Sequence, residues 1–409
     1  MFYKIFSKRS IIHWSLLILA VAIVGDRLLV INLPAVGRVP LLDVVVVGLA
    51  IWGGLSYVRK IKSSVTPLFV WFGGLFIILA GIALAGSGRW LTLSEIFQSS
   101  LFWWRWIFYF GLIFWVAELP VKIKQWLAQL LGIMWGTVAL LGWIQLIFVP
   151  DLGFWERLGW DPHQHRLVST FLDPNLLGGF LVLGLAFCLA QLTSTHLPKS
   201  KRWWWGGLAA LLLISIIFTY SRSALLALLV LGLFWGWRYW KIALIGLAVM
   251  GLIYGLSPRW QERISGAMNL DETVRYRLES WDQAVDIMRQ QPWLGVGYNT
   301  LRFTREDYGY QPVSHATTGF DSSLLTIGVT AGSLGLAAYL GLLVSALAWA
   351  KQQITNTNRV VARVAQAFLA GMSALLVHSL FVNSLLYAPI MVVGWIILGL
   401  IWNNRTDDV

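Results

Sequence analysis

Long apolar runs dominate this sequence and limit its possible folds more than any other feature. Twelve such segments follow one another along the 409 residues, at about 11–31, 41–57, 67–86, 101–117, 126–149, 174–192, 203–219, 223–237, 241–257, 323–350, 362–384 and 387–402. A helix that crosses a bilayer needs ~20 mostly apolar residues. Only 12% of the residues are charged, about half the share usual in soluble proteins. The sequence therefore predicts an all-α polytopic membrane protein, with about twelve transmembrane helices in a single integral membrane domain over 1–409.

The charges between the segments predict which side of the membrane each loop faces. A net charge of +12 would suggest a nucleic-acid partner in a soluble protein, but cytoplasmic loops of membrane proteins collect lysine and arginine for topological reasons. All ten lysines fall in alternate flanks, which therefore form the cytoplasmic side: Lys4, Lys8, Lys60, Lys62, Lys122, Lys124, Lys199, Lys201, Lys241 and Lys351. Both termini fall on the same side. We expect membrane lipids as neighbours, and no nucleic acid.

The opposite side carries arginine as its only cation. Lysine and arginine serve the topological signal equally, so sidedness alone does not explain the difference. Arginine differs in its planar fork of donors, which binds phosphate or carboxylate through two parallel hydrogen bonds. Chance combined with stacking on aromatic rings is the alternative explanation. The single cysteine, Cys188, lies inside an apolar run, and we expect neither a metal ion nor a cofactor.

The longest stretch between apolar segments is 258–322, which we expect to form a large extracytoplasmic loop, since loops of this length are usually functional. Residues 269–291 predict one amphipathic helix within it. Asn269 is suited to cap this helix together with Glu272, and Pro292 would end it. Apolar residues recur at helical spacing at Val274, Leu278, Trp281 and Val285.

Several arginines on this side are candidates for binding an anion. Arg222 stands in a tight hairpin between two apolar runs, and an ionisable group at the membrane surface indicates a functional site; snorkelling or helix capping is its alternative role. Arg275 and Arg277 open the loop helix. Arg277 and Trp281 share a helix face and would present a cation beside an aromatic ring, which suits a phosphorylated sugar. Alternatively, Trp281 packs the helix onto the membrane domain while Arg277 pairs with a neighbouring glutamate.

His315 and Asp321 close the loop, just before the tenth apolar segment. Either side chain is suited to take a proton from a sugar hydroxyl, because histidine is the commonest general base and a buried aspartate also serves. His315 could instead be an ordinary loop residue. Asp321 could be the cap of the following helix, since Asp-Ser-Ser before an apolar run is a good capping signal.

Four segments carry a resemblance to a known family: STFLDPNLLGGFLVL, whose Asp-Pro-Asn core includes Asn175; TYSRSALLAL around Arg222; RLESWDQAVDIMRQQPWLGVGYNTLRF from Arg277; and DSSLLTIGVTAGSLGLAAYL from Asp321. Together they resemble the O-antigen ligase and polymerase superfamily of bacterial surface-polysaccharide pathways. Their order is that of the family, and they cover about residues 165–345. One departure concerns the base, because the family usually has His-Asn where this chain has Asp321-Ser322. The base is then Asp321 by substitution, His315 by a shift in the loop, or absent.

The resemblance implies a fold of twelve spans and a glycosyltransferase of the bacterial plasma membrane. Such enzymes transfer a glycan from undecaprenyl diphosphate to an acceptor hydroxyl on a glycan, lipid or protein, at the outer membrane face. The hairpin and loop-helix arginines, here Arg222 and Arg277, would hold the diphosphate. We add Arg275 as a third diphosphate-binding candidate, and expect Asn175 and Trp281 to contact the substrate. The alternative is a transporter of a small anion or glycolipid, which would place ionisable residues near the middle of the membrane.

Overall fold

The computed structural model describes residues 8–33, 37–58, 66–158, 162–195, 197–236, 251–252, 254–310 and 319–402. Its long helices are α2 (Lys8–Gly25), α3 (Leu41–Val58), α4 (Leu68–Gly86), α5 (Leu93–Ala117), α6 (Val121–Phe148), α7 (Pro174–Leu192), α8 (Lys199–Phe218), α9 (Arg222–Gly236), α11 (Pro258–Met268), α12 (Glu272–Gln290), α14 (Ser323–Gln353), α15 (Arg359–Ser379) and α16 (Ala388–Ile401). The short elements are η1 (Asp26–Leu28), η2 (Ser87–Arg89), η3 (Gly153–Leu158), η4 (Ser169–Phe171), α13 (Leu301–Thr304) and η5 (Glu306–Tyr308).

Among the described residues, eight helices are long and apolar enough to cross a membrane, and three shorter apolar helices accompany them at Leu41–Leu55, Arg222–Gly236 and Ala388–Ile401. These eleven helices correspond to eleven of the predicted segments. Most of the twelfth, predicted at 241–257, lies outside the described residues, so the total of twelve spans stays a prediction. The chain is a helical multi-pass membrane protein.

Some details of the helices differ from the sequence prediction. α5 begins eight residues before the predicted 101, because Thr92 and Glu95 form a capping box there. A short antiparallel hairpin, β1 (Val30–Leu33) with β2 (Gly37–Pro40), joins α2 to α3 and pairs Val30 with Pro40. This hairpin was not expected in an all-α protein.

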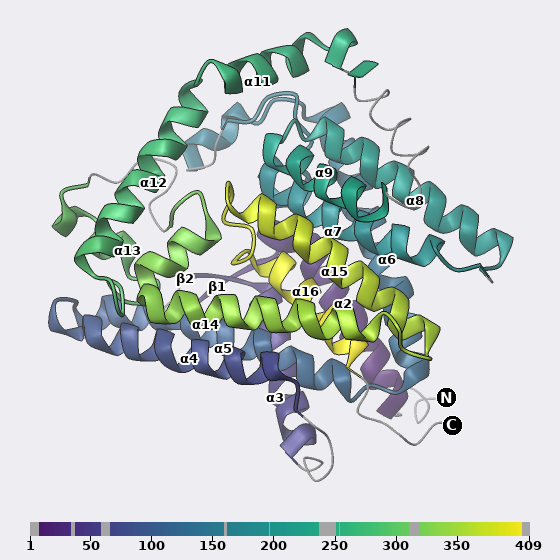
Figure 1. Ribbon diagram of the computed structural model, residues 1–409, viewed down its shortest axis with the longest axis horizontal. Helices are drawn as coiled ribbons and strands as arrows, with labels where there is room; N and C mark the ends of the chain where they lie inside the picture. The colour runs from purple at the N-terminus through teal and green to yellow at the C-terminus, as the bar shows by residue number, and fades with distance from the viewer. Residues whose placement is uncertain are drawn as a thin grey trace.

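α7 is the central helix of the bundle. Of its apolar window, 83% is buried inside the protein, against 33% for α2 and α4. It packs against α8, α9 and α15, while α14 packs along α4, and α5 along α3 and α16 (Figure 1). Trp135 of α6 fits against Gly184 of α7, which shows how glycine lets a large ring reach the helix backbone. The outward surface is apolar, as expected for contact with lipid tails.

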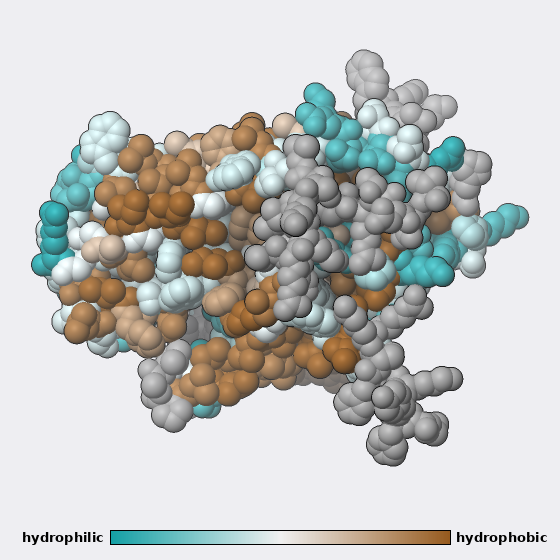
Figure 2. Space-filling model, turned by 90° about the horizontal axis from the view of Figure 1, so that it is seen from below, coloured by the Kyte–Doolittle hydropathy of each residue, from teal (hydrophilic) through white to brown (hydrophobic). Residues whose placement is uncertain are grey.

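The apolar surface forms a band between two polar ends. Figure 2 shows hydrophobic residues over the middle of one face, with hydrophilic residues gathered toward both ends. The described chain begins and ends near the same place, because His13 of α2 packs on Trp126 of α6 at 4.8 Å and Lys124 donates to the carbonyl of Trp402, after α16. The loop helices α11 and α12 lie away from this end (Figure 1).

Candidate active site

The site is built where the N-termini of α7 and α9 meet. Asp173 caps α7 by accepting hydrogen bonds from the backbone N–H groups of Asn175 and Leu176, at 2.7 and 3.1 Å. The Ser221 hydroxyl, just before α9, donates to Oδ1 of Asn175 at 2.8 Å. The helices approach closely because a methyl group at Gly178 would lie 2.8 Å from Cβ of Ala224. The Asp-Pro-Asn segment therefore positions the hairpin that carries the first arginine.

Arg222 is the first residue of α9 and reaches the loop helix α12. Its Nη2 donates to Oδ2 of Asp271 at 2.9 Å and to the Thr273 hydroxyl at 2.5 Å. Its Nη1 is buried and has no hydrogen-bond partner among the described residues. Burial alone would raise the pKa of Asp271, but its hydrogen bonds from Thr273 and Arg222 lower it. Arg222 thus holds an aspartate while one of its donors stays unused.

Arg277 lies on α12, six residues after Asp271, and is half-buried. Its buried Nε has no hydrogen-bond partner in the part of the chain that the structure describes. Burial lowers the pKa of this guanidinium; Asp321 counteracts the effect and Arg222 adds to it. Arg277 forms no ion pair with Glu272 or Glu279 within the described part of the chain. Arg222 and Asp321 therefore both lie close enough to Arg277 to affect its pKa.

Sequence reasoning missed three further arginines beside this pair. Arg166 is buried and donates from Nε to the carbonyl of Thr219 at 2.8 Å. Arg259 and Arg263 lie one turn apart on α11, which the sequence did not predict as a separate helix. Ser257 followed by Pro258 was the available signal, since Ser257 caps α11 and proline suits its first turn.

The α8–α9 hairpin and α11 are held together by an aromatic contact. The ring of Tyr220 packs at 5.2 Å from that of Trp260, and the guanidinium of Arg259 lies 4.5 Å from the centre of the Tyr220 ring. Arg259 also donates to the backbone carbonyls of Gln164 and His165. These contacts fix the starts of α9 and α11 relative to residues 162–173.

These residues form what we call the arginine cluster: Arg166, Arg222, Arg259, Arg263 and Arg277. The pKa of Arg166 is lowered to about 9, mainly by burial and also by its neighbours Arg263, Arg259 and Arg222, while Asp173 opposes them. The pKa of Arg263 is lowered by burial and then by Arg222 and Arg259. Five guanidinium groups gather around three aspartates, so positive charge is left in excess. An incoming anion would relieve this repulsion.

The other predicted residues are placed differently. Trp281 packs on Phe381 with ring centres 5.7 Å apart and so packs α12 on the bundle. Its buried Nε1 has no hydrogen-bond partner within the described ranges and remains an unused donor. Arg275 is exposed and donates to the Leu270 carbonyl at 2.9 Å, away from Arg277 on the helix. His315 lies outside the described residues.

The helix α12 itself differs from its prediction in two respects. Its cap is Asp271, which accepts from the Val274 N–H at 3.0 Å, rather than Asn269. Its buried residues are Ser280, Ala284 and Ile287, whereas Leu278 and Val285 of the predicted apolar stripe are 47% and 37% exposed. Ala284 and Ile287 pack into an apolar cluster with Phe320 and Val329, so the buried face of the helix differs from the predicted stripe.

After α12 the chain docks onto a break in α14. Gly332 has φ 69° and ψ −175° inside this helix, a conformation that glycine tolerates and other residues do not. The freed backbone groups bind the loop: Ser333 N–H donates to the Pro292 carbonyl at 2.8 Å, and Val296 N–H donates to the Val329 carbonyl at 2.9 Å. A methyl group at Gly332 would lie 2.1 Å from the Trp293 carbonyl oxygen. The break therefore anchors the C-terminal end of α12.

Asp321 lies just before Ser322, which is the residue that caps α14 by accepting from the Leu325 N–H at 3.4 Å. Burial lowers the pKa of both Arg277 and Arg305, and the negative charge of Asp321 offsets part of this effect. Arg305 is held by Gln283 at 2.9 Å and lies 4.9 Å from the centre of the Phe320 ring. The Asp321 carboxylate therefore lies next to the arginine cluster, and Ser322 rather than Asp321 caps α14.

One arginine on the same side is fully neutralised. Arg105, inside α5, binds both carboxylate oxygens of Asp43 on α3, and the Tyr109 hydroxyl donates to the same carboxylate at 2.6 Å. A paired arginine of this kind serves the packing of α3 on α5. It contrasts with the cluster, where cations outnumber acids.

Comparison with known proteins finds a matching family model and a similar protein. Residues 207–340 match the family model described as O-antigen ligase, which includes Arg222, Arg277 and Asp321 but not Asn175. A general O-oligosaccharyltransferase of Acinetobacter baylyi (strain ATCC 33305 / BD413 / ADP1) is 22% identical over 259 residues, which cover 57% of this chain and 41% of that protein. The match thus spans less than half of the relative. These findings confirm the resemblance to the O-antigen ligase superfamily that the motifs indicated.

Proposed function

We propose that the chain transfers a glycan from undecaprenyl diphosphate to an acceptor hydroxyl at the outer face of the bacterial plasma membrane. The observation that carries the proposal is the excess of buried and half-buried guanidinium groups around the starts of α7, α9 and α12. Glycosyl transfer breaks the bond between the sugar and its diphosphate, and negative charge accumulates on the leaving group. Fixed cations at that position lower the barrier.

In this mechanism, Arg222 and Arg277 bind the diphosphate and Asp321 takes the proton of the acceptor hydroxyl. The acceptor oxygen forms the new bond to the anomeric carbon as the bond to the diphosphate breaks, and undecaprenyl diphosphate departs. Nη1 of Arg222 and Nε of Arg277 are buried donors with no partner in the described structure, and phosphate oxygens would satisfy both. The Acinetobacter relative, by its name, transfers oligosaccharides to oxygen, which supports a hydroxyl acceptor.

The lysine-rich flanks support the assignment of faces. If they are cytoplasmic, both termini are cytoplasmic and the cluster faces the outside, where lipid-linked glycans would be used. Asn175 then positions the hairpin, Trp281 lies beside Arg277 where a sugar ring would be bound, and the 258–322 loop covers the reaction.

The transporter alternative would need ionisable groups midway through the bundle. Asp26 and Arg27 lie in η1 at the end of α2, and His378 lies in the last turn of α15. The break in α14 falls at its tenth residue of 31 and is filled by loop backbone. These positions favour a surface reaction over transport.

The decisive experiment incubates the purified protein with an undecaprenyl-diphosphate-linked oligosaccharide and a panel of acceptors. We expect release of undecaprenyl diphosphate together with a glycan-bearing product. Movement of an intact glycolipid or a small anion across reconstituted vesicles, without bond cleavage, would contradict the proposal.

A further inference from the structure

A second cationic site lies at the other end of α7 from the arginine cluster. A pocket of ≈ 250 Å³ is lined there by Thr193, Ser194, Thr195, Ile354, Thr355, Asn356, Arg359, Ala362 and Arg363. Thr193 is the C-terminal cap of α7, whereas Asp173 in the cluster is its N-terminal cap. A 19-residue helix separates its ends by about 28 Å, so this pocket is distinct from the proposed active site.

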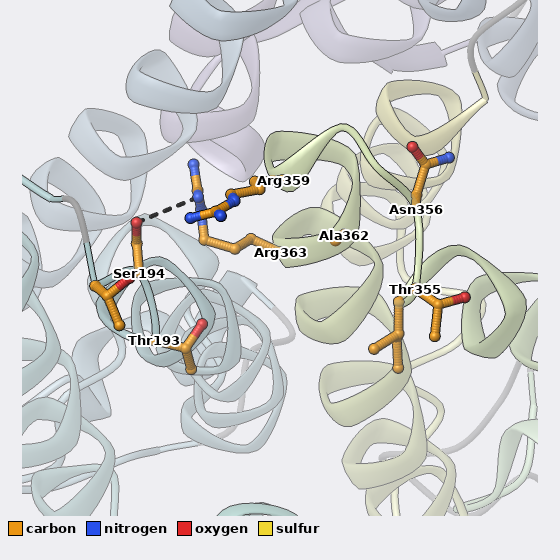
Figure 3. A pocket seen from close by; sticks show the side chains of 9 residues that line it. Thr193, Ser194, Thr355, Asn356, Arg359, Ala362 and Arg363 are labelled. Carbon is orange, nitrogen blue, oxygen red and sulfur yellow. Dashed lines mark hydrogen bonds between the residues drawn. The ribbon is translucent and has the colours of Figure 1, made fainter.

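The lining suits a phosphate group. Arg359 and Arg363 are four residues apart and share one face of α15, and none of the nine lining residues is acidic. Figure 3 shows the two guanidinium groups side by side near Ser194, with Thr355 and Asn356 across the pocket. Two planar forks with hydroxyl groups nearby bind phosphate oxygens well.

The two arginines differ in how they are held. Arg363 donates from Nε to Gln191 at 3.2 Å and from Nη1 to the Ser194 hydroxyl at 3.4 Å, so its orientation is set before any ligand arrives. Arg359 is exposed and makes no hydrogen bond or ion pair within the described ranges. One arginine is preorganised and the other has all its donors free for a ligand.

The surroundings place the pocket at the depth of lipid head groups. Arg202 donates to the carbonyl of Ser194 at 3.0 Å, and the tryptophans that follow it on α8, Trp203 and Trp204, are 81% and 49% exposed. Exposed tryptophans beside cations are typical of the membrane interface. Lys199, Lys201 and Lys351 flank the same region, so this is the predicted cytoplasmic side.

We propose that this pocket binds the phosphate group of an anionic ligand at the cytoplasmic interface. Basic pockets between transmembrane helices at this depth bind the head groups of anionic lipids. A soluble phosphate compound offers the same chemistry, and the experiment below separates the two sources. The proposal is independent of the transfer reaction on the other face.

The test measures binding to the purified, detergent-solubilised protein by native mass spectrometry. Phosphatidylglycerol, phosphatidylcholine and inorganic phosphate are titrated separately, and phosphate is also added as a competitor of phosphatidylglycerol. The variant is Arg359→Gln, with Arg359→Lys as the conservative change. The control is Lys122→Gln, which removes an exposed cation at the start of α6 on the same face but outside the pocket.

We expect phosphatidylglycerol to bind more tightly than phosphatidylcholine. Arg359→Gln should weaken this binding roughly fivefold, the effect of one cation near a charged interface, whereas Lys122→Gln should leave it unchanged and Arg359→Lys should restore part of it. Binding of inorganic phosphate with the same dependence on Arg359, together with displacement of the lipid, would identify a soluble ligand as the source. Equal binding of the two lipids, or equal effects of Arg359→Gln and Lys122→Gln, would overturn the proposal.

Discussion

Replacing Arg222 by lysine tests the diphosphate-binding role most directly. The variant keeps the positive charge but loses the planar fork. In the structure, Nη2 alone binds Asp271 and Thr273, while Nη1 is buried without a partner. A lysine nitrogen can replace Nη2 in the ion pair with Asp271, but nothing replaces Nη1. The change therefore separates the existing contact from the donor that we assign to the substrate.

The expected magnitudes differ between stability and activity. The side chains of Arg222 and Asp271 are 19% and 29% exposed, and partly exposed ion pairs contribute only ~0–1 kcal/mol, so the thermal midpoint should barely change. A lost hydrogen bond to a charged phosphate costs ~1.5–3 kcal/mol. That corresponds to a decrease of roughly 10- to 150-fold in kcat/KM.

The assay follows undecaprenyl diphosphate released from a lipid-linked oligosaccharide by the purified Arg222→Lys variant. The matched control is Arg289→Lys, since Arg289 also pairs with an aspartate, Asp286 at 3.4 Å, but is 75% exposed near the end of α12. The control should retain normal activity. If Arg222→Lys keeps more than half of the wild-type kcat/KM, the diphosphate role of this residue is wrong.

Three other substitutions test the remaining parts of the site. Arg277→Lys should accumulate undecaprenyl-linked glycan in cells, because its fork is the second proposed diphosphate ligand; normal lipid-linked pools would contradict this role. Asp321→Asn should lower turnover more than His315→Ala, since Asp321 lies beside Arg277; the opposite order would favour His315 as the base. Gly332→Ala should destabilise the protein by at least ~1–3 kcal/mol and lower its thermal midpoint. The control Gly207→Ala should have little effect, because a methyl group there meets nothing within 4 Å. Equal midpoints for the two variants would refute the docking of the loop on the break in α14.

Much of the bundle could be predicted from sequence because apolar length alone determines a membrane span. Eleven segments have helical counterparts among the described residues. The prediction was less accurate at helix ends, because local capping determines the residue at which a helix begins or ends. Thr92 with Glu95 extends α5 outward from the apolar run, and polar residues of this kind do not register as part of a span. The short β1–β2 hairpin carries no periodicity long enough to recognise.

Only some residues of the candidate site could be proposed from sequence. Arg222 and Arg277 were singled out because a cation in an apolar hairpin and a cation beside tryptophan are unusual locally. Arg166 could not be found in this way, because its importance comes from the carbonyl of Thr219, 53 residues away along the chain. The buried face of α12 was also beyond sequence reasoning, since it depends on which face of the bundle the helix covers.

The break at Gly332 has a further consequence for how this protein can vary. Backbone groups of 292–296 hold the end of α12. Within that segment Gly295 cannot change freely, because its φ is 68° and a methyl group there would lie 2.2 Å from the Val329 carbonyl oxygen. The number of residues between Arg277 and the anchor is restricted as well. Inserting or deleting a single residue there would swing the guanidinium by about 100° around the helix axis, away from Arg222. The chain from Arg277 to the anchor must therefore preserve its length as well as the glycine at 295.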